Sequence, residues 1–294
     1  EDMVEDWLDC ARRWANDQKF QIDVQTIQNR HTPHAAGRAL ADVADVAIRS
    51  LFPRIADDFA TKHGQFEDGG LAVFALGKHG GQELSPGSDL DMVFIYDVPE
   101  DAEESDGDKP LSPGHYYIRL SQRYINALSA PTAEGILFET DLRLRPSGSK
   151  GPLATHFKSF DTYQNNDAWT WEHMALTRLR PVYGPENLCK KVVATTNAVL
   201  CKKRDPDRLV REVFDMRNRM DAGKGDNHPW AIKMRRGGLV DLEFIAQYLQ
   251  LRHAHDHPEI LSPTTRDVFK NLDAAGILDG EQAKFLANAG SFWL

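Results

Sequence analysis

Apolar residues recur at helical spacing near the start of the chain and again over most of its second half. The first pattern predicts a helix over 4–20 and a longer one over 35–63, interrupted or kinked at Pro53. The second predicts that everything after His156 is helical. Its individual helices are expected over 157–166, 169–180, 186–202, 207–221 and 239–253, with two more before the end.

The middle of the chain has a different pattern. Two short apolar runs, LAVFAL (71–76) and LDMVFIY (90–96), predict strands, and a third strand is expected over about 136–144. The stretch GKHGGQELSPGSD (77–89) is rich in turn residues, and a helix is expected over about 115–128. Helices, then strands, then helices alone indicate an α+β fold followed by an all-helical region.

Composition narrows the class of protein. The 294 residues have an ordinary apolar content and a net charge of −9, which argues against nucleic-acid and membrane partners. No apolar run is long enough to cross a bilayer. Cys10, Cys189 and Cys201 lack metal-site spacing, and we expect reduced thiols in a cytoplasmic protein. The acid-rich run 97–108 is expected to be a solvated loop. The chain lacks an initial Met and stops inside an amphipathic run, so we expect a piece of a longer protein.

The candidate chemistry starts with two aspartates. Asp89 and Asp91 are two positions apart, so in a strand they project to one side while Leu90 and Met92 face the other. Two carboxylates held together repel unless a cation neutralises them, and oxygen ligands of this kind favour Mg²⁺ or Mn²⁺. The alternative is a turn followed by a strand whose aspartates are merely solvated.

A third aspartate lies on the next predicted strand. Asp141, Arg143 and Arg145 alternate with Leu142 and Leu144, which predicts that the three charged residues share one strand face. Three carboxylates from two neighbouring strands suit a two-metal site for displacement at phosphorus, with the arginines on phosphate oxygens. The alternative is a ladder of cross-strand salt bridges.

Other residues are typical of phosphate binding. Gly80 and Gly81 could bring backbone N–H groups close to a phosphate, and Ser88 adds a hydroxyl. Lys233 and Arg235 precede a glycine pair and a predicted helix, where an anion site is as plausible as a basic surface. If Asp241 and Glu243 lie on that helix, they cannot hold one ion together.

These residues resemble a known family. The glycine pair, the motif Ser-Asp-Leu-Asp and the later aspartate are similar to the nucleotidyltransferase superfamily that includes DNA polymerase beta. A closer resemblance is to the glutamine synthetase adenylyltransferases. It is carried by GKHGGQELSPGSDLDMVFIYD, DLRLRPSGSKGPLA, AWTWEHMALTRLRPVYG and KMRRGGLVDLEFIAQYLQL, which begin at residues 77, 141, 168 and 233. The sequence departs from the family at His79, where Leu is usual, and at Ala231, where Asp is common.

The resemblance implies a fold and an activity. It implies a nucleotidyltransferase-type small mixed sheet with flanking helices, in a catalytic domain over 35–155. A helical lead-in (1–34) would precede that domain, and an all-helical domain (156–294) would follow. Asp89, Asp91 and Asp141 would hold two Mg²⁺ ions with ATP, and AMP would pass to a tyrosine hydroxyl of glutamine synthetase.

Family members carry two such units. RLRPSG (143–148) and WTWEH (169–173) resemble the carboxy-terminal one, which attaches AMP. The full-length parent would also respond to a nitrogen-signalling protein. Removal of AMP by phosphate, and a non-catalytic docking module, remain open as alternatives at this stage.

Overall fold

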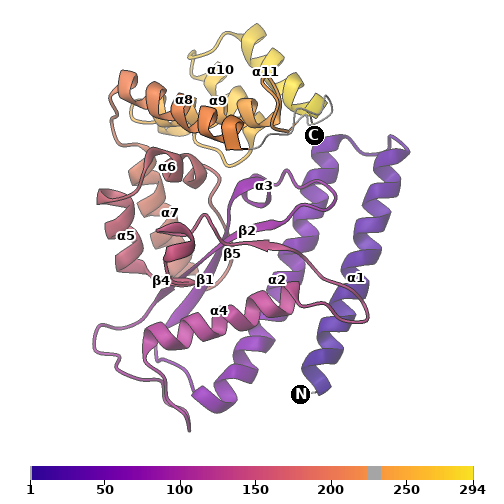
Figure 1. The fold of residues 1–294 in the computed structure, drawn as a ribbon, viewed down its shortest axis with the longest axis vertical. Coiled ribbons are helices and arrows are strands. Elements are labelled where there is room, and N and C mark those ends of the chain that lie inside the picture. Colours follow the sequence, from indigo (N-terminus) through magenta and orange to yellow (C-terminus); the bar gives the residue numbers. More distant parts are fainter. Residues whose placement is uncertain (1, 224–232, 294) are drawn as a thin grey trace.

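The computed structural model describes residues 2–223 and 233–293, which form a small mixed sheet, the helices on its two faces and a helical region beyond it (Figure 1). The α-helices are α1 (Asp2–Ile27), α2 (Pro33–His63), α3 (Gly77–Gly80), α4 (Pro113–Ser129), α5 (Phe157–Asn166), α6 (Thr170–Leu176), α7 (Glu186–Leu200), α8 (Pro206–Gly223), α9 (Leu239–His253), α10 (Thr265–Ala274) and α11 (Gly280–Trp293). The strands are β1 (Gly70–Ala75), β2 (Leu90–Asp97), β3 (Thr140–Asp141), β4 (Ala154–His156) and β5 (Arg180–Tyr183), and the 3₁₀ turns are η1 (Gly148–Lys150) and η2 (Pro258–Ile260).

The sheet is built around β2. This strand is antiparallel to β1 on one side and parallel to β3 and then β4 on the other. β5 pairs antiparallel with the free side of β1, which gives the order β3-β2-β1-β5. The α+β class and the small mixed sheet expected from the sequence are confirmed.

Both faces of the sheet are buried. One face carries Leu90, Met92 and Phe94 against α2 and α4, and the other carries Val93 and Ile95 against α5, α6 and α7. Because the pleat alternates, Asp91 lies on the same face as Val93, toward the second half of the chain. A separate core joins α9, α10 and α11.

Several expected elements differ from the structure. α2 is not interrupted at Pro53, which lies inside the continuous helix, and the alternative of a kink there stays a prediction. The third strand is only two residues long: the Arg143 N–H bonds to the Asp141 side chain in the turn that follows, and before the strand the Leu137 carbonyl accepts a hydrogen bond from Lys19 on α1. The expectation that everything after His156 is helical is wrong, because β5 returns to the sheet.

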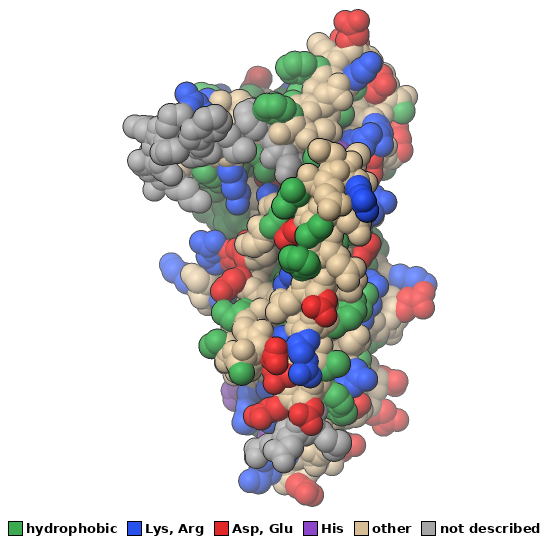
Figure 2. Space-filling view, turned by 90° about the vertical axis from the view of Figure 1, so that its right-hand side faces the viewer, with side chains coloured by type: hydrophobic (Ala, Val, Ile, Leu, Met, Phe, Trp, Pro, Cys, Tyr) green, Lys and Arg blue, Asp and Glu red, His purple; other side chains and the backbone are tan. Residues whose placement is uncertain are grey.

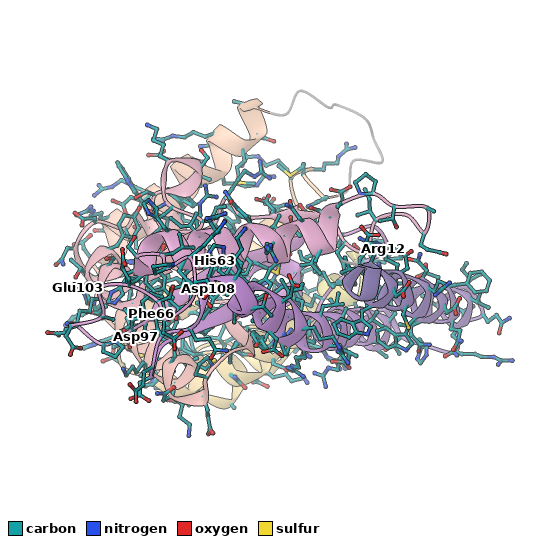
Figure 3. The ribbon with its side chains drawn as sticks, turned by 90° about the horizontal axis from the view of Figure 1, so that it is seen from below. Arg12, His63, Phe66, Asp97, Glu103 and Asp108 are labelled. Atoms are coloured by element: carbon teal, nitrogen blue, oxygen red, sulfur yellow. The ribbon has the colours of Figure 1, made fainter. Side chains whose placement is uncertain are left out.

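The surface features match the composition. The acidic run forms a loop between β2 and α4, and Figure 3 shows Asp97, Glu103 and Asp108 around the end of α2 at His63. The loop is partly anchored, because the buried Ser105 hydroxyl donates to the His63 carbonyl. Hydrophobic side chains are scattered among charged ones on the face that includes α1 (Figure 2). None of the described helices is long and apolar enough to cross a membrane.

Candidate active site

The three aspartates come together at the edge of the sheet where β2 begins. Asp91 is the second residue of β2 and pairs in register with Asp141 on the parallel strand β3. Asp89 lies two residues earlier, is exposed, and precedes the strand instead of belonging to it. The backbone therefore brings all three residues to one place, although only Asp91 and Asp141 are in strands.

Asp91 is the electrostatic centre of this group. Burial, together with the negative charges of Asp89 and Asp141, raises the pKa of Asp91 from 3.8 to about 7. Lys233 and Arg178 oppose the shift. A carboxyl group of this kind is poorly ionised alone and gains strongly from a nearby divalent cation. The donor set and its charge therefore fit Mg²⁺ or Mn²⁺.

Asp141 already has a partner in the structure. Its carboxylate accepts hydrogen bonds from the Arg143 backbone N–H at 2.8 Å and from the Arg143 side chain, including Nε at 2.8 Å. These bonds lower the pKa of Asp141. Within the described residues, no three His, Cys, Asp or Glu side chains are already arranged as ligands of one ion. A joint role of the aspartates in metal binding thus stays a prediction.

The two arginines do not share a strand face with Asp141, because the strand ends at that residue. Arg143 is exposed and turns back to Asp141. The Arg145 guanidinium donates to main-chain carbonyls before and after it in the chain. These acceptors are Leu142 at 2.7 Å, Gly151 at 3.1 Å and Ser149 at 3.2 Å. Arg145 thereby holds the loop together, and Arg143 is the more exposed candidate for a phosphate contact.

An open cleft of about 810 Å³ adjoins the aspartates. It is large enough for a nucleotide, since small-molecule sites commonly measure about 300–1,000 Å³. Its lining consists of Gly87, Asp89, Ile125, Glu139, Thr140, Asp141, Leu142, Arg143 and Arg145. Substrate and carboxylates can therefore meet in one place.

The glycines near the cleft have packing roles. The N–H groups of Gly80 and Gly81 bond to the carbonyls of Leu76 and Gly77, at 2.7 and 3.1 Å. A Cβ on Gly80 would lie 1.9 Å from the Arg178 carbonyl oxygen. The expected phosphate contact of this pair stays a prediction, since their N–H groups are engaged in the structure.

Gly77 is a functional candidate that the sequence analysis missed. A Cβ on this residue would lie 2.0 Å from the Asp91 carboxylate, and its φ of +50° is in the left-handed region. Only a glycine lets Asp91 sit so close to the start of α3. The signal in the sequence was present, because Gly77 opens the run GKHGG, but only the glycine pair was singled out.

Ser88 and a lysine form a short polar chain beside the cleft. The Ser88 hydroxyl oxygen accepts the Ser85 N–H at 3.1 Å and lies 2.9 Å from the Ser85 hydroxyl. The Lys78 amine donates to that Ser85 hydroxyl at 3.0 Å. Burial lowers the pKa of Lys78. Ser88 thus shapes the loop before Asp89, and Lys78 is a cation that sequence reasoning missed.

The two basic residues before α9 occupy different environments. Lys233 is exposed, and its charge acts on Asp91 across the space between the sheet and α9. Arg235 is also exposed, and its carbonyl accepts the Gly238 N–H at 2.8 Å. Ala231 lies outside the described residues. Lys233 is therefore the better placed of the two candidates for a contact near the aspartates.

Comparison with known proteins agrees with this geometry. Residues 1–195, about two thirds of the chain, match the family model described as glutamate-ammonia ligase adenylyltransferase. This chain belongs to that adenylyltransferase family. Residues 212–294 match a second model, described as GlnD PII-uridylyltransferase. The family that the sequence motifs resemble is thereby confirmed.

Curated relatives of the adenylyltransferase family come from several bacteria. The chain is 49% identical to the bifunctional glutamine synthetase adenylyltransferase/adenylyl-removing enzyme of Mesorhizobium japonicum, over 83% of its own length and 25% of that protein. Proteins of the same name from Brucella suis and Xanthobacter autotrophicus are 43% identical, over 92% and 98% of this chain. The chain spans 25% to 29% of the length of these relatives.

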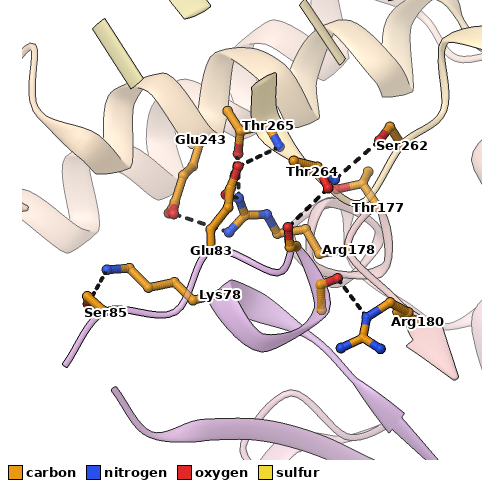
Figure 4. A network of polar contacts seen from close by, with 12 residues as sticks. Lys78, Glu83, Ser85, Thr177, Arg178, Arg180, Glu243, Ser262, Thr264 and Thr265 are labelled. Carbon is orange, nitrogen blue, oxygen red and sulfur yellow. Dashed lines mark hydrogen bonds and ion pairs between the residues drawn. The ribbon is translucent and has the colours of Figure 1, made fainter. Parts of the chain in front are cut away.

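A buried network connects this candidate site to the helical region (Figure 4). Glu83, in the loop after α3, pairs with Arg178 and accepts the Thr265 N–H and hydroxyl, both at 3.0 Å. Arg178 also donates to Glu243 on α9 at 3.2 Å. Because Glu83 is buried, losing Arg178 would leave its carboxylate with the hydrogen bonds from Thr265 and without the cation that pairs with it. Glu243 is therefore connected to the site by its ion pair with Arg178, and it does not form a second pair of acidic ligands with Asp241.

A second buried group explains one departure from the family pattern. His79 lies on α3, and its Nε2 is 2.8 Å from Asp45 on α2. Asp45 also accepts two hydrogen bonds from Arg180 on β5, at 2.6 and 3.0 Å. His79 thus joins a network that fastens the short helix beside Asp91 to α2 and β5.

Proposed function

We propose that this chain is an adenylylating unit that transfers AMP from ATP to a tyrosine hydroxyl of glutamine synthetase and releases pyrophosphate. The observation that carries the proposal is the partly buried Asp91 carboxyl group beside Asp89 and Asp141, which line a nucleotide-sized cleft. The family of the chain and the motifs at 143–148 and 169–173 support transfer over other reactions at phosphorus.

Each aspartate has a proposed role. Asp89, Asp91 and Asp141 would hold two Mg²⁺ ions, for which Mn²⁺ can substitute. Such ions neutralise the triphosphate and polarise the attacking and leaving oxygens of an in-line displacement. Asp141 is also the residue proposed to accept the proton of the tyrosine hydroxyl. The remaining work of the protein is positioning and charge compensation.

Three cations surround the proposed phosphate path. Arg143 is exposed and becomes available to a phosphate oxygen when it leaves Asp141. The charge of Lys233 acts on Asp91 and also on Lys78, so the two lysines lie near enough for their charges to interact. Gly80, Gly81, Ser88, Arg145 and Arg235 complete the proposed binding set.

The wider setting also belongs to the proposal. The match of residues 212–294 to a uridylyltransferase described by its PII substrate supports a nitrogen-signalling partner for the longer protein. The three cysteines are unpaired in the structure, which supports a reducing, cytoplasmic setting. The net charge of −9 leads us to propose neither nucleic acid nor an acidic membrane surface as a partner.

The test is incorporation of label from α-labelled ATP into glutamine synthetase with Mg²⁺. We expect labelling by the chain and its loss in Asp89→Asn and Asp91→Asn. Asp97→Asn, at the opposite end of β2, is the matched control and should label normally. Normal labelling by either active-site variant would reject the site.

The printed name of the relatives also covers removal of AMP. Incubation of adenylylated glutamine synthetase with phosphate distinguishes this reaction, because it releases ADP. Release of ADP without incorporation of label would assign the removing activity instead. Binding of glutamine synthetase with neither reaction would indicate a docking module.

A further inference from the structure

One face of α1 runs beside the segment that leads from α4 to Asp141. Its side chains at positions 12, 16 and 19 follow helical spacing and face the same way. They donate to main-chain carbonyls in matching order: Arg12 to Ala127 and Ala130 at 3.3 and 3.2 Å, Asn16 to Glu134 at 3.4 Å, and Lys19 to Leu137 at 2.6 Å. The helix thus follows the segment for about 10 Å.

These bonds replace the strand pairing that this segment lacks. Between α4 and β3, the only strand-type pairing within the described segment is an isolated bridge between Thr132 and Gly135. Arg12 is almost completely buried, and the Lys19 amine lies 3.7 Å from the centre of the Phe138 ring. Burial lowers the pKa of Lys19 to about 8. Burying a cation costs free energy unless its hydrogen bonds are made. The buried positions of Arg12 and Lys19 therefore indicate that their hydrogen bonds fix the segment between α4 and β3.

The segment delivers Asp141 to the site. After Leu137, the Phe138 N–H bonds to the Leu128 carbonyl at 3.0 Å, and the Glu139 carbonyl accepts the Leu90 N–H at 2.9 Å. The two residues of β3 follow directly. A strand of this length has too few hydrogen bonds to fix its own register. The position of Asp141 therefore depends on what holds the residues before it.

We propose that α1 is a positioning element of the active site, in which Lys19, Asn16 and Arg12 set the place of Asp141 relative to Asp91. This inference rests on the proposed role of Asp141 in holding a cation. Lys19 is the most informative of the three, because its bond lies four residues before Asp141. It also lines a cavity of about 220 Å³ that extends to Ser88.

The test is a Mn²⁺ titration of the chain, followed by the signal of free Mn²⁺ in electron paramagnetic resonance. Lys19→Met removes the donor and keeps the length of the side chain, and we expect about tenfold weaker Mn²⁺ binding, as for other residues that orient metal ligands. Lys19→Arg should restore most of the affinity. Gln21→Met, an exposed position on the same helix, is the matched control and should bind as the unaltered chain does.

A double-mutant cycle separates positioning from general stability. In an Asp141→Asn background, Lys19→Met should have no further effect on Mn²⁺ binding, because both changes act through the same carboxylate. Additive effects, or unaltered affinity in Lys19→Met, would overturn the inference. Failure of the unaltered chain to bind Mn²⁺ would instead reject the proposed function. Should Lys19→Met not fold, Asn16→Ala, which is exposed, answers the same question.

Discussion

Asp91 makes the metal-free protein less stable than it could be at neutral pH. Its pKa in the folded protein, about 7, lies above the ordinary value of 3.8. Between these values the folded protein retains a proton that the unfolded chain has lost. The stability contributed by this proton is present at low pH and is lost as the pH rises through 7.

The magnitude follows from the shift. A change from 3.8 to about 7 corresponds to roughly 4 kcal/mol. The side chain is only partly buried, so solvent screens part of this energy, and we expect about 2 kcal/mol. Asp91→Asn should therefore stabilise the chain by about 2 kcal/mol at pH 8 without metal, while it abolishes transfer of AMP.

The measurement is urea-induced unfolding in EDTA at pH 8 and at pH 5. The advantage of Asp91→Asn should fall to less than half at pH 5, where Asp91 is protonated in the folded protein. Mg²⁺ at saturating concentration should stabilise the unaltered chain and not the variant. Asp97→Asn, which instead loses a pairing with Lys191, should gain nothing. A gain in Asp91→Asn that is absent at pH 8, or equal at both values, would refute this electrostatic reasoning.

Three further variants test other features. Gly77→Ala should lower the rate of AMP transfer about a hundredfold, because the new Cβ displaces the Asp91 carboxylate. Steady-state kinetics measure this loss, and a cooperative unfolding curve shows that the variant is folded. Arg178→Met should destabilise by about 3–5 kcal/mol at pH 7 in urea, because Glu83 is left buried without its partner, and a loss under 1 kcal/mol would contradict the network. Burial lowers the pKa of His173 from 6.5 to about 4, so stability is lost as the pH falls below 6.5. Between pH 7 and pH 5, the free energy of unfolding of His173→Gln should fall by about 2 kcal/mol less than that of the unaltered chain. Equal decreases in urea-induced unfolding would contradict the lowered pKa of His173.

Local patterns were sufficient for much of the fold. The apolar runs gave β1 and β2 within one residue, and helical spacing gave α5 and α9 with the observed bounds. The pleat also predicted that Leu90 and Met92 face away from Asp91, which their packing confirms. These features depend on residues that are adjacent in the chain, so the sequence alone is enough to predict them.

Features set by distant partners were not predictable in the same way. β5 contains Pro181 and is four residues long, so its strand character comes from pairing with β1. The third strand is shorter than expected, and within its expected range the Leu137 carbonyl bonds to Lys19 on the distant helix α1. Likewise, the spacing of Asp141 and Arg143 could not show that the two side chains bind each other in a turn.

The position of β5 limits how this molecule can be divided. A boundary at residue 155 looks natural along the chain, because the main run of strands is over. A fragment that ended there would lack β5, and the N–H and C=O groups of Val73 to Ala75 that β5 covers would face solvent. Bare sheet edges of this kind recruit strands from other molecules. We therefore expect such a fragment to self-associate, whereas one that extends past Tyr183 keeps this edge capped.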